Sequence, residues 1–234
     1  MNKGFTLSEI LITLGIVGIV AVLTVPGVMR NYQNRLYTAQ LEKVYAQISD
    51  AAQAIMNDEH VDNYYETTAG GTMNAECPAS GNCTTGLGYF LNNYFKSVKK
   101  NCNRGDDKCI YTENDKYKTI SGENINGVTS ANNHYCVQTV TGASICGFHN
   151  TNNNCTSILV DVNGLAQPNV TGRDVFAMDI HKNGSISDYN SGCADNSKGA
   201  PANTCTTTIS TSSIFTTASG CLNSIIDAGW KMEY

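Results

Sequence analysis

Glu9 stands at the start of a mostly apolar run that extends from Ile10 to Val25. A charged side chain costs free energy inside a bilayer and less near its interface, so an acid at this position indicates a specific role. One such role is local: the helix dipole favours an acid in the first turn of a helix, where it can lie among the lipid headgroups. Glu9 is therefore the first candidate functional residue of the chain.

Later acidic residues suggest a metal at two places. The segment that begins at Asp179 starts like an EF-hand loop, but it has histidine at the third position and Asn190 at the twelfth, where a glutamate is required. We interpret that segment as a hairpin. The oxygen atoms of Asp161, Asn163 and Asp174 could bind calcium. Turns made of Asp, Asn and Gly explain the same residues without a metal, and no other cofactor is indicated.

Ten cysteines are the second feature with chemical consequences. None are spaced as C-x-x-C, so disulfides in an oxidising compartment are favoured over zinc or redox sites. Cys77 and Cys83 are close enough in sequence to close a small loop, and Cys102 and Cys109 are as well. The full pairing stays open, because ten cysteines allow about nine times the 105 arrangements of eight. The ten are Cys77, Cys83, Cys102, Cys109, Cys136, Cys146, Cys155, Cys193, Cys205 and Cys221.

Neither catalysis nor nucleic-acid binding is indicated by the remaining residues. The histidines stand in no G-x-S-x-G or His-Glu-x-x-His context, and we expect no enzymatic activity. Lysines and arginines number 15 and acidic residues 20, a net charge of −5 that argues against nucleic acid as the main partner. One basic cluster is most simply a solvated helix end, with a DNA-uptake surface as the alternative; its members are Lys96, Lys99, Lys100 and Arg104.

A long N-terminal helix must position Glu9. The stretch 5–29 has about 25 residues and would span about 37 Å as a helix, while a bilayer core needs about 20 apolar residues. In the stretch 30–58 apolar residues recur at spacings of three and four, which predicts an amphipathic continuation. A continuous helix would be about 78 Å long. Pro26 lacks an N–H group, so we expect a kink there.

The remaining chain predicts an antiparallel sheet with a C-terminal appendage. Residues 59–133 are rich in Gly, Asn and Thr, with one helix expected near Leu87–Lys99. Residues 134–190 alternate short β-branched runs with tight turns, and Cys136 could face Cys146 across the first hairpin. Residues 191–234 end in an expected helix at Cys221–Ala228. The expected strands are His134–Val140, Ala143–His149, Ser157–Val162, Asp174–His181 and Ser185–Tyr189. The predicted fold class is α+β, with the second half of the long helix packed on a disulfide-rich sheet.

The segment from Lys3 to Met29 resembles the type IV prepilin signal, which type IV pilins and type II secretion pseudopilins share. Gly4, Phe5 and Glu9 stand at the spacing of that family. The resemblance implies that a prepilin peptidase cuts between Gly4 and Phe5 and methylates the new amine. Unlike a protein with an ordinary secretory signal, the mature chain would keep its apolar segment. The implied divisions are a leader 1–4, a transmembrane and polymerisation helix 5–29, its continuation 30–58, a connecting region 59–133, the sheet 134–190 and the C-terminal region 191–234.

The resemblance also assigns roles to single residues. Glu9 would pair with the amine of a neighbouring subunit's Phe5, and such an ion pair in an apolar bundle penalises wrong registers. Neighbouring helices would tolerate local unwinding between Gly18 and Pro26. A loop similar to 161–174 recurs in pilin-like proteins, and some pseudopilins bind calcium near this place. A C-terminal region bounded by a disulfide would hold the last segment on the sheet.

The function implied is that of a non-enzymatic subunit of a type IV pilus or a type II secretion pseudopilus. Its partners would be other pilin-like subunits, the prepilin peptidase, an inner-membrane platform protein and, indirectly, an assembly ATPase. Before assembly it would span the inner membrane once, with its N-terminus cytoplasmic and its head periplasmic. After assembly it would lie in a surface pilus or a periplasmic pseudopilus. The alternative is a signal-anchored binding or hydrolytic protein that keeps its leader and does not polymerise.

Overall fold

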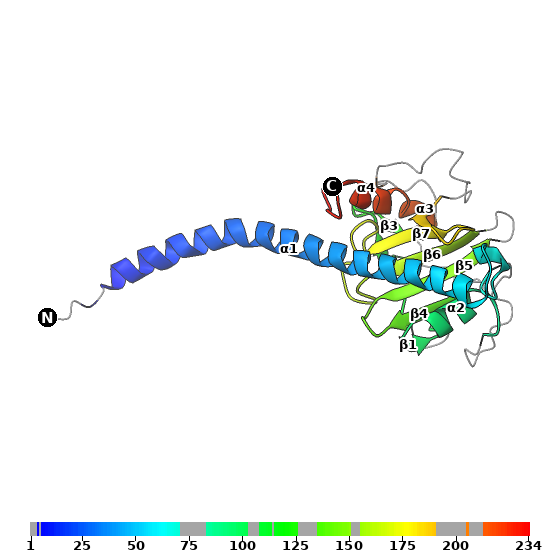
Figure 1. The fold of residues 1–234 in the computed structure, drawn as a ribbon. Helices are drawn as coiled ribbons and strands as arrows, with labels where there is room; N and C mark the ends of the chain where they lie inside the picture. The colour runs from blue at the N-terminus through cyan, green and yellow to red at the C-terminus, as the bar shows by residue number, and fades with distance from the viewer. Residues whose placement is uncertain are drawn as a thin grey trace. The chain divides into compact units, whose positions relative to one another are not determined.

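A computed structural model of the chain describes residues 4, 6–70, 83–102, 108–113, 115–125, 135–150, 155–190, 205 and 213–234. The chain divides into two units, Met1–Leu36 and Tyr37–Tyr234, which we describe separately. Helix α1 (Leu7–Asp58) contributes to both of them (Figure 1). We call the second unit the head.

In the first unit, α1 presents apolar side chains that nothing in the described chain covers. They range from 43% exposed at Ile10 to 79% exposed at Leu7. The helix is long and apolar enough to cross a membrane. Its backbone is helical through both Gly18 and Pro26, so the local unwinding implied for a filament is absent from this single chain.

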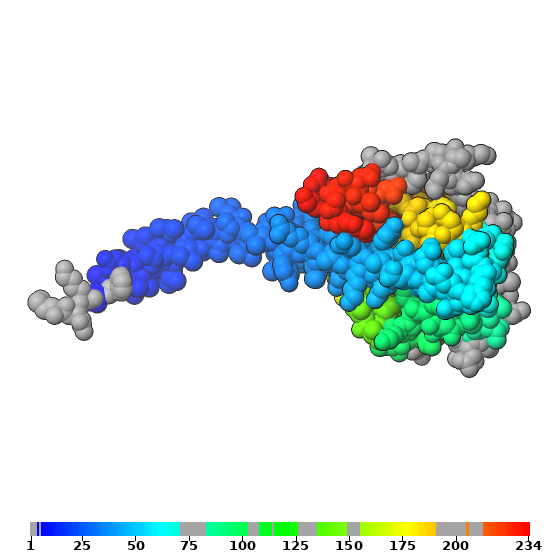
Figure 2. All heavy atoms as spheres, in the orientation of Figure 1, coloured from blue at the N-terminus to red at the C-terminus, as the bar shows by residue number. Residues whose placement is uncertain are grey.

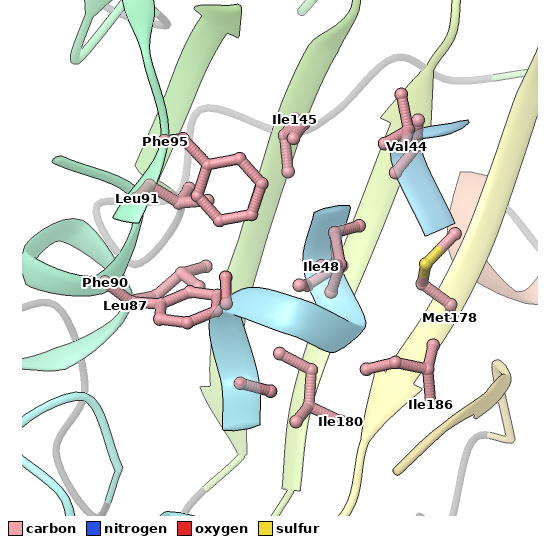
Figure 3. Packing of buried hydrophobic residues seen from close by; sticks show 14 of the residues in the cluster. Val44, Ile48, Leu87, Phe90, Leu91, Phe95, Ile145, Met178, Ile180 and Ile186 are labelled. Atoms are coloured by element: carbon pink, nitrogen blue, oxygen red, sulfur yellow. The ribbon is translucent and has the colours of Figure 1, made fainter. Parts of the chain in front are cut away.

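In the head, the second part of α1 buries one stripe of side chains. Figure 3 shows Val44 and Ile48 lying over the strands that carry Ile145 and Met178. The buried residues recur at spacings of three and four, which confirms the predicted amphipathic continuation. They are Tyr37, Thr38, Leu41, Val44, Ile48, Ala51, Ala52, Ile55 and Met56.

The sheet of the head has six strands in the order β1-β4-β5-β6-β7-β8, and every neighbouring pair is antiparallel. Two further strands, β2 (Tyr117–Lys118) and β3 (Asn124–Ile125), form a separate small sheet. With α1 packed against the large sheet, the predicted α+β class is confirmed. The six strands are β1 (Ser97–Lys100), β4 (Tyr135–Thr139), β5 (Ser144–Asn150), β6 (Cys155–Asp161), β7 (Val175–Ile180) and β8 (Ile186–Asp188).

The helix expected near Leu87–Lys99 is shorter than predicted. Helix α2 (Gly86–Tyr94) ends where Phe95 adopts an extended backbone, and the chain then forms β1 beside β4. Val98 keeps helical spacing from Leu91 and Tyr94, so periodicity alone extends the helix through it. Residues 97–100 form a strand instead, because they pair with β4 and because the Val140 N–H donates to the Lys96 carbonyl (3.0 Å). The 3-10 turn η1 (Tyr64–Glu66) and the short helix α3 (Ile214–Thr217) were not predicted.

Both faces of the sheet are buried. One face packs against α1, α2 and helix α4 (Cys221–Asp227), with Ile158 and Met178 among its buried side chains. The other face carries Leu159 and Ala177 and packs against α3 through Phe215. Because α3 and α4 lie on opposite faces, the C-terminal chain passes around the β8 edge. Figure 2 shows α1 lying between the C-terminal segment in red and the α2–β1 region in green.

Three disulfides join described cysteines. Cys136 and Cys146 are directly opposite each other on β4 and β5 and are bonded, which confirms that prediction. The expected pair of Cys102 and Cys109 is also bonded, and Cys205 is bonded to Cys221. Two others, Cys83 and Cys155, are disulfide-bonded as well, but the predicted partner Cys77 lies outside the described residues, as does Cys193.

Replacing Ile48 with alanine should destabilise the head, because Ile48 is fully buried between α1 and the sheet. We expect the free energy of unfolding to fall by about 2–5 kcal/mol. Lys43→Ala, an exposed change on the same helix, should alter it by less than about 0.5 kcal/mol. Urea denaturation of the full chain in detergent, followed by the fluorescence of the single Trp230, measures both. Equal effects of the two changes would contradict the packing.

Candidate functional site

Glu9 lies in the first turn of α1, where it forms a capping box with Thr6. Its Oε2 accepts the Thr6 backbone N–H (2.8 Å) and the Thr6 hydroxyl (2.8 Å). The Glu9 backbone N–H in turn donates to Thr6 Oγ1 (3.3 Å). These bonds satisfy donors that a helix start otherwise leaves unpaired.

The capping box was missed in the sequence, although Thr6-Leu7-Ser8-Glu9 has the pattern of threonine followed three residues later by glutamate. In the single chain the Glu9 carboxylate therefore caps the start of α1. Both bonds from Thr6 reach Oε2, and among the described residues none reaches Oε1. That oxygen can accept a hydrogen bond from another chain. Gly4 is exposed, and Phe5 lies outside the described residues.

Asp161 and Asp174 lie at the two ends of the loop that joins β6 to β7, and both side chains are fully buried. Asp174 Oδ2 accepts the Asn169 N–H (2.8 Å), and its Oδ1 accepts the Val170 N–H (2.6 Å). Asp161 Oδ1 accepts the Asn163 N–H (3.3 Å). The structure therefore brings together the three residues that the sequence nominated for calcium.

The two carboxylates are close enough to perturb each other. Burial raises the pKa of Asp161 well above its ordinary value, and the charge of Asp174 raises it further. Burial raises the pKa of Asp174 to about 6, although backbone N–H groups oppose that shift. No described lysine or arginine forms an ion pair with either acid. A proton or a bound cation must therefore relieve the repulsion.

Two asparagine side chains of this loop have oxygen atoms without a hydrogen bond in the described chain. Asn169 is fully buried, and neither its side-chain oxygen nor its nitrogen makes a hydrogen bond within the described chain. The side-chain oxygen of Asn163 is also buried and unpaired there. Two carboxylates and two amide oxygens form a hard donor set that fits calcium. The described residues hold no group of three or more His, Cys, Asp or Glu side chains, so the set depends on the asparagines. Asn169 was not nominated from sequence, although it stands in the same Asn- and Asp-containing loop.

The C-terminus holds this loop in place. Tyr234 donates its hydroxyl to the Gly172 carbonyl (2.5 Å), although the two residues are 62 positions apart. Gly172 has φ +80°, and a Cβ there would come within 2.4 Å of Cys205 Sγ. Only glycine fits both the backbone and the close approach of the Cys205–Cys221 disulfide. The disulfide-bounded C-terminal region expected from the resemblance therefore packs on the head.

Asp188 anchors helix α4 to the sheet. Its carboxylate accepts the N–H groups of Gly220 (2.8 Å) and Asn223 (2.8 Å) at the start of that helix. Burial raises its pKa to about 7 in spite of these donors. Asp179 plays a similar part, accepting the Ser157 hydroxyl (2.7 Å) and the Asn190 N–H (2.9 Å), and burial raises its pKa to about 6. The hairpin predicted for this segment is confirmed by the pairing of β7 with β8.

The contact that most resembles catalytic machinery joins His181 Nε2 to Ser187 Oγ (2.7 Å). The Ser187 hydroxyl is within reach of two acceptors, the Asp188 carbonyl (3.1 Å) and His181 Nε2, and the tautomer of His181 decides which of them accepts its proton. Of the other histidines, His60 is exposed, His134 lies outside the described residues, and the side chain of His149 is not described.

Together the fold and the N-terminus define an α+β protein with an exposed apolar helix and a disulfide-linked sheet. A family model for the prokaryotic N-terminal methylation motif matches residues 1–25. This motif is the signal of type IV pilins and pseudopilins, and it indicates a pilin-like protein processed by prepilin peptidase. Comparison with curated proteins finds no match to the chain, and comparison with solved structures finds none either.

The raised pKa of Asp188 predicts a pH dependence of stability. The folded protein holds a proton up to about pH 7 that the unfolded chain releases near the ordinary value of 3.8. The free energy of unfolding should therefore fall as pH rises from about 4 to about 7. Asp188→Asn removes this contribution, so the slope between pH 6 and pH 7 should become shallower than in the wild type, while Asp174 and Asp179 still contribute at lower pH.

Urea denaturation between pH 4 and pH 8 tests this expectation through the fluorescence of Trp230. Asp227→Asn, a change of an exposed acid on α4, is the control for a general loss of charge. If Asp188→Asn kept the wild-type slope between pH 6 and pH 7, the assignment to Asp188 would be wrong.

Proposed function

We propose that the chain is a structural subunit of a type IV pilus or a type II secretion pseudopilus. A prepilin peptidase cuts it after Gly4 and methylates Phe5, and it polymerises through α1. The observation that carries the proposal is the apolar surface of the first unit, which begins at Leu7 within the methylation motif and continues beyond it. An apolar surface of this extent needs lipid or other subunits to cover it.

Assembly then has a simple physical basis. Inside a bilayer the lipid tails are as apolar as the helices, so helix association depends on packing and polar contacts rather than on hydrophobicity. A subunit that leaves the bilayer needs its neighbours, because each Å² of apolar surface kept from water contributes about 25 cal/mol. The filament core therefore replaces the membrane as the apolar environment of α1.

Glu9 sets the register of this assembly. In the capping box its Oε1 remains available to the amine of a neighbour's Phe5. An ion pair in an apolar bundle is favourable only when both partners are well matched, so every other register leaves a charge unpaired. Pro26 contributes to assembly by allowing the helix to unwind locally where neighbouring helices shield its backbone.

The proposed location follows from this cycle. The N-terminus is cytoplasmic and the head periplasmic before assembly, and the platform protein and the assembly ATPase drive extraction from the membrane. The disulfides of the head suit an oxidising exterior.

Two substitutions of Glu9 separate its charge from its capping role. Glu9→Gln keeps the pattern of a capping box but removes the charge, whereas Glu9→Ala removes both. If the charge sets the register, both variants should insert into the membrane normally, and neither should appear in sheared surface filaments. Intact-mass analysis of wild-type filaments should find a chain that begins at methylated Phe5. Normal filaments from Glu9→Gln would assign Glu9 to capping alone.

The rival function is a signal-anchored binding or hydrolytic protein. It predicts a chain that retains residues 1–4, stays monomeric and tolerates Glu9→Ala. The methylation motif favours the filament subunit. A mature chain that still carries Met1–Gly4 would favour the rival.

We propose calcium as a ligand of the β6–β7 loop, held by Asp161, Asn163, Asp174 and Asn169. The unpaired, fully buried side chain of Asn169 is the observation that favours it. When bound, the cation would supply positive charge between two buried carboxylates. The residues themselves join β6, β7 and the C-terminus at one place, so the ligand would stabilise the head.

Calcium should raise the stability of the wild-type head by about 2.7 kcal/mol at a hundred times its dissociation constant. Asp161→Asn and Asp174→Asn should abolish this gain, because each removes one of the two charges. Asp179→Asn, which alters a buried acid with different partners, should keep it. Thermal unfolding with calcium, with magnesium and with chelator measures the response. The same unfolding curve in calcium and in chelator would refute the site.

A further inference from the structure

The head contains a groove with no role in the proposed function. It has a volume of about 470 Å³ and lies between α1, the end of α2 and the turn that joins β4 to β5. Small side chains of α1, including Ala51 and Ala54, form one wall. Tyr94 and Val140 line the opposite side.

Some side chains around this groove are exposed apolar groups or lack a hydrogen-bond partner within the described part of their own chain. Val98 is 63% exposed and Val140 60% exposed, and they are the two large apolar side chains exposed in the described part of the head. The Val140 N–H donates to the Lys96 carbonyl (3.0 Å), which places Val140 beside the start of β1, and Val98 stands at the irregularity in the β1–β4 register. The side-chain oxygen of Gln47 is buried in the described chain without a hydrogen bond. Exposed apolar side chains beside a groove mark an interaction surface.

Two opposite charges also border the groove. Asp50 lies on α1 and Lys96 on the far side, and both are exposed. Neither forms an ion pair with another described residue, since the ion pair found there joins Lys108 to Glu113. A partner with one cation and one anion at matching separation would satisfy both.

The C-terminal segment 227–234 of the same chain carries Lys231 and Glu233, two positions apart. It lies across α1 from the groove region, as Figure 2 shows in red and green, and Trp230 packs against Tyr45 with their ring centroids 5.5 Å apart. Exposure alternates along the segment, so that Lys231 and Glu233 face outward and Met232 is half-buried. Lys231 and Glu233 are two residues apart in an extended segment, which separates them by about 7 Å.

We propose that the outward-facing side chains of residues 227–234 of one copy dock in the groove of the next copy in the filament, while Trp230, Met232 and Tyr234 stay packed on their own head. Lys231 pairs with Asp50, and Glu233 pairs with Lys96. The aliphatic parts of Lys231 and Glu233 cover Val98 and Val140. This contact rests on the proposed function, because it requires polymerised copies with parallel α1 helices.

The two surfaces lie at different heights along α1. Trp230 packs at Tyr45, whereas the groove is centred near Ala51, and six residues of helix correspond to about 9 Å. A contact between two different surfaces, displaced along an axis, produces an open helical filament rather than a closed dimer or ring.

Photo-cross-linking in filaments of the full chain tests the contact. With p-benzoylphenylalanine in place of Val140, mass spectrometry should find a cross-link to residues 227–234 of a second copy. The same probe at Lys116, an exposed residue on the β2 side of the head, should give no such link. A cross-link from position 140 to another protein or another segment, or no cross-link in intact filaments, would overturn the proposal.

Charge reversal supplies an independent measurement. Lys96→Glu and Glu233→Lys should each lower the filament yield by about tenfold, and the double variant should return it to within about twofold of wild type. Both changes are on the surface, so the urea midpoint of each monomer should match wild type. Failure of the double variant to recover would contradict the pairing.

The two proposals fail in different ways. Filaments that form through Glu9 but show no dependence on Lys96 or Glu233 refute only the groove contact. A wild-type chain that forms no filaments refutes the proposed function and this contact with it.

Discussion

The apolar surface on the first half of α1 is the constraint on which the rest of the molecule depends. Its side chains are exposed in the single chain, and no described residue of the head covers them. Only a lipid bilayer or other subunits can do so. The same helix continues into the head, where Val44, Ile48 and Ile55 form the centre of the core. One helix therefore provides both an apolar surface that needs to be covered and part of the core that supports the sheet.

The head buries both faces of its sheet, which antiparallel sheets often leave half-solvated. Covering both faces requires the C-terminal chain to pass around the β8 edge, and Asp188 holds it there by accepting the N–H groups at the start of α4. Asp161, Asp174 and Asp179 are buried as well. Their raised pKa values show that burial outweighs the hydrogen bonds they accept. The disulfides Cys136–Cys146 and Cys205–Cys221 brace this arrangement covalently.

Most of the architecture could be predicted because it depends on periodicity and turn chemistry. Local sequence patterns predict the amphipathic stripe of α1 and the order of hairpins from β4 to β8. They also predict that Cys136 faces Cys146 across a hairpin. The helix expected near Leu87–Lys99 was too long, because Val98 fits a helical spacing and only the pairing with β4 shows that it belongs to a strand. The capping box of Thr6 and Glu9 was visible in the sequence and was missed. Asn169 has no distinguishing pattern, since its unpaired side chain is a property of the folded loop.

What the sequence by itself determined is the part that acts locally: the methylation motif, the length and apolarity of the span, and the stripe that continues into the head. Each of these lies within one continuous segment, where spacing along the chain is also spacing in the molecule. Tertiary structure alone decided that β1 joins the sheet and that Asp50 and Lys96 border one groove. These relations join residues from distant segments. They exist only because burial of the sheet on both faces brings those segments together.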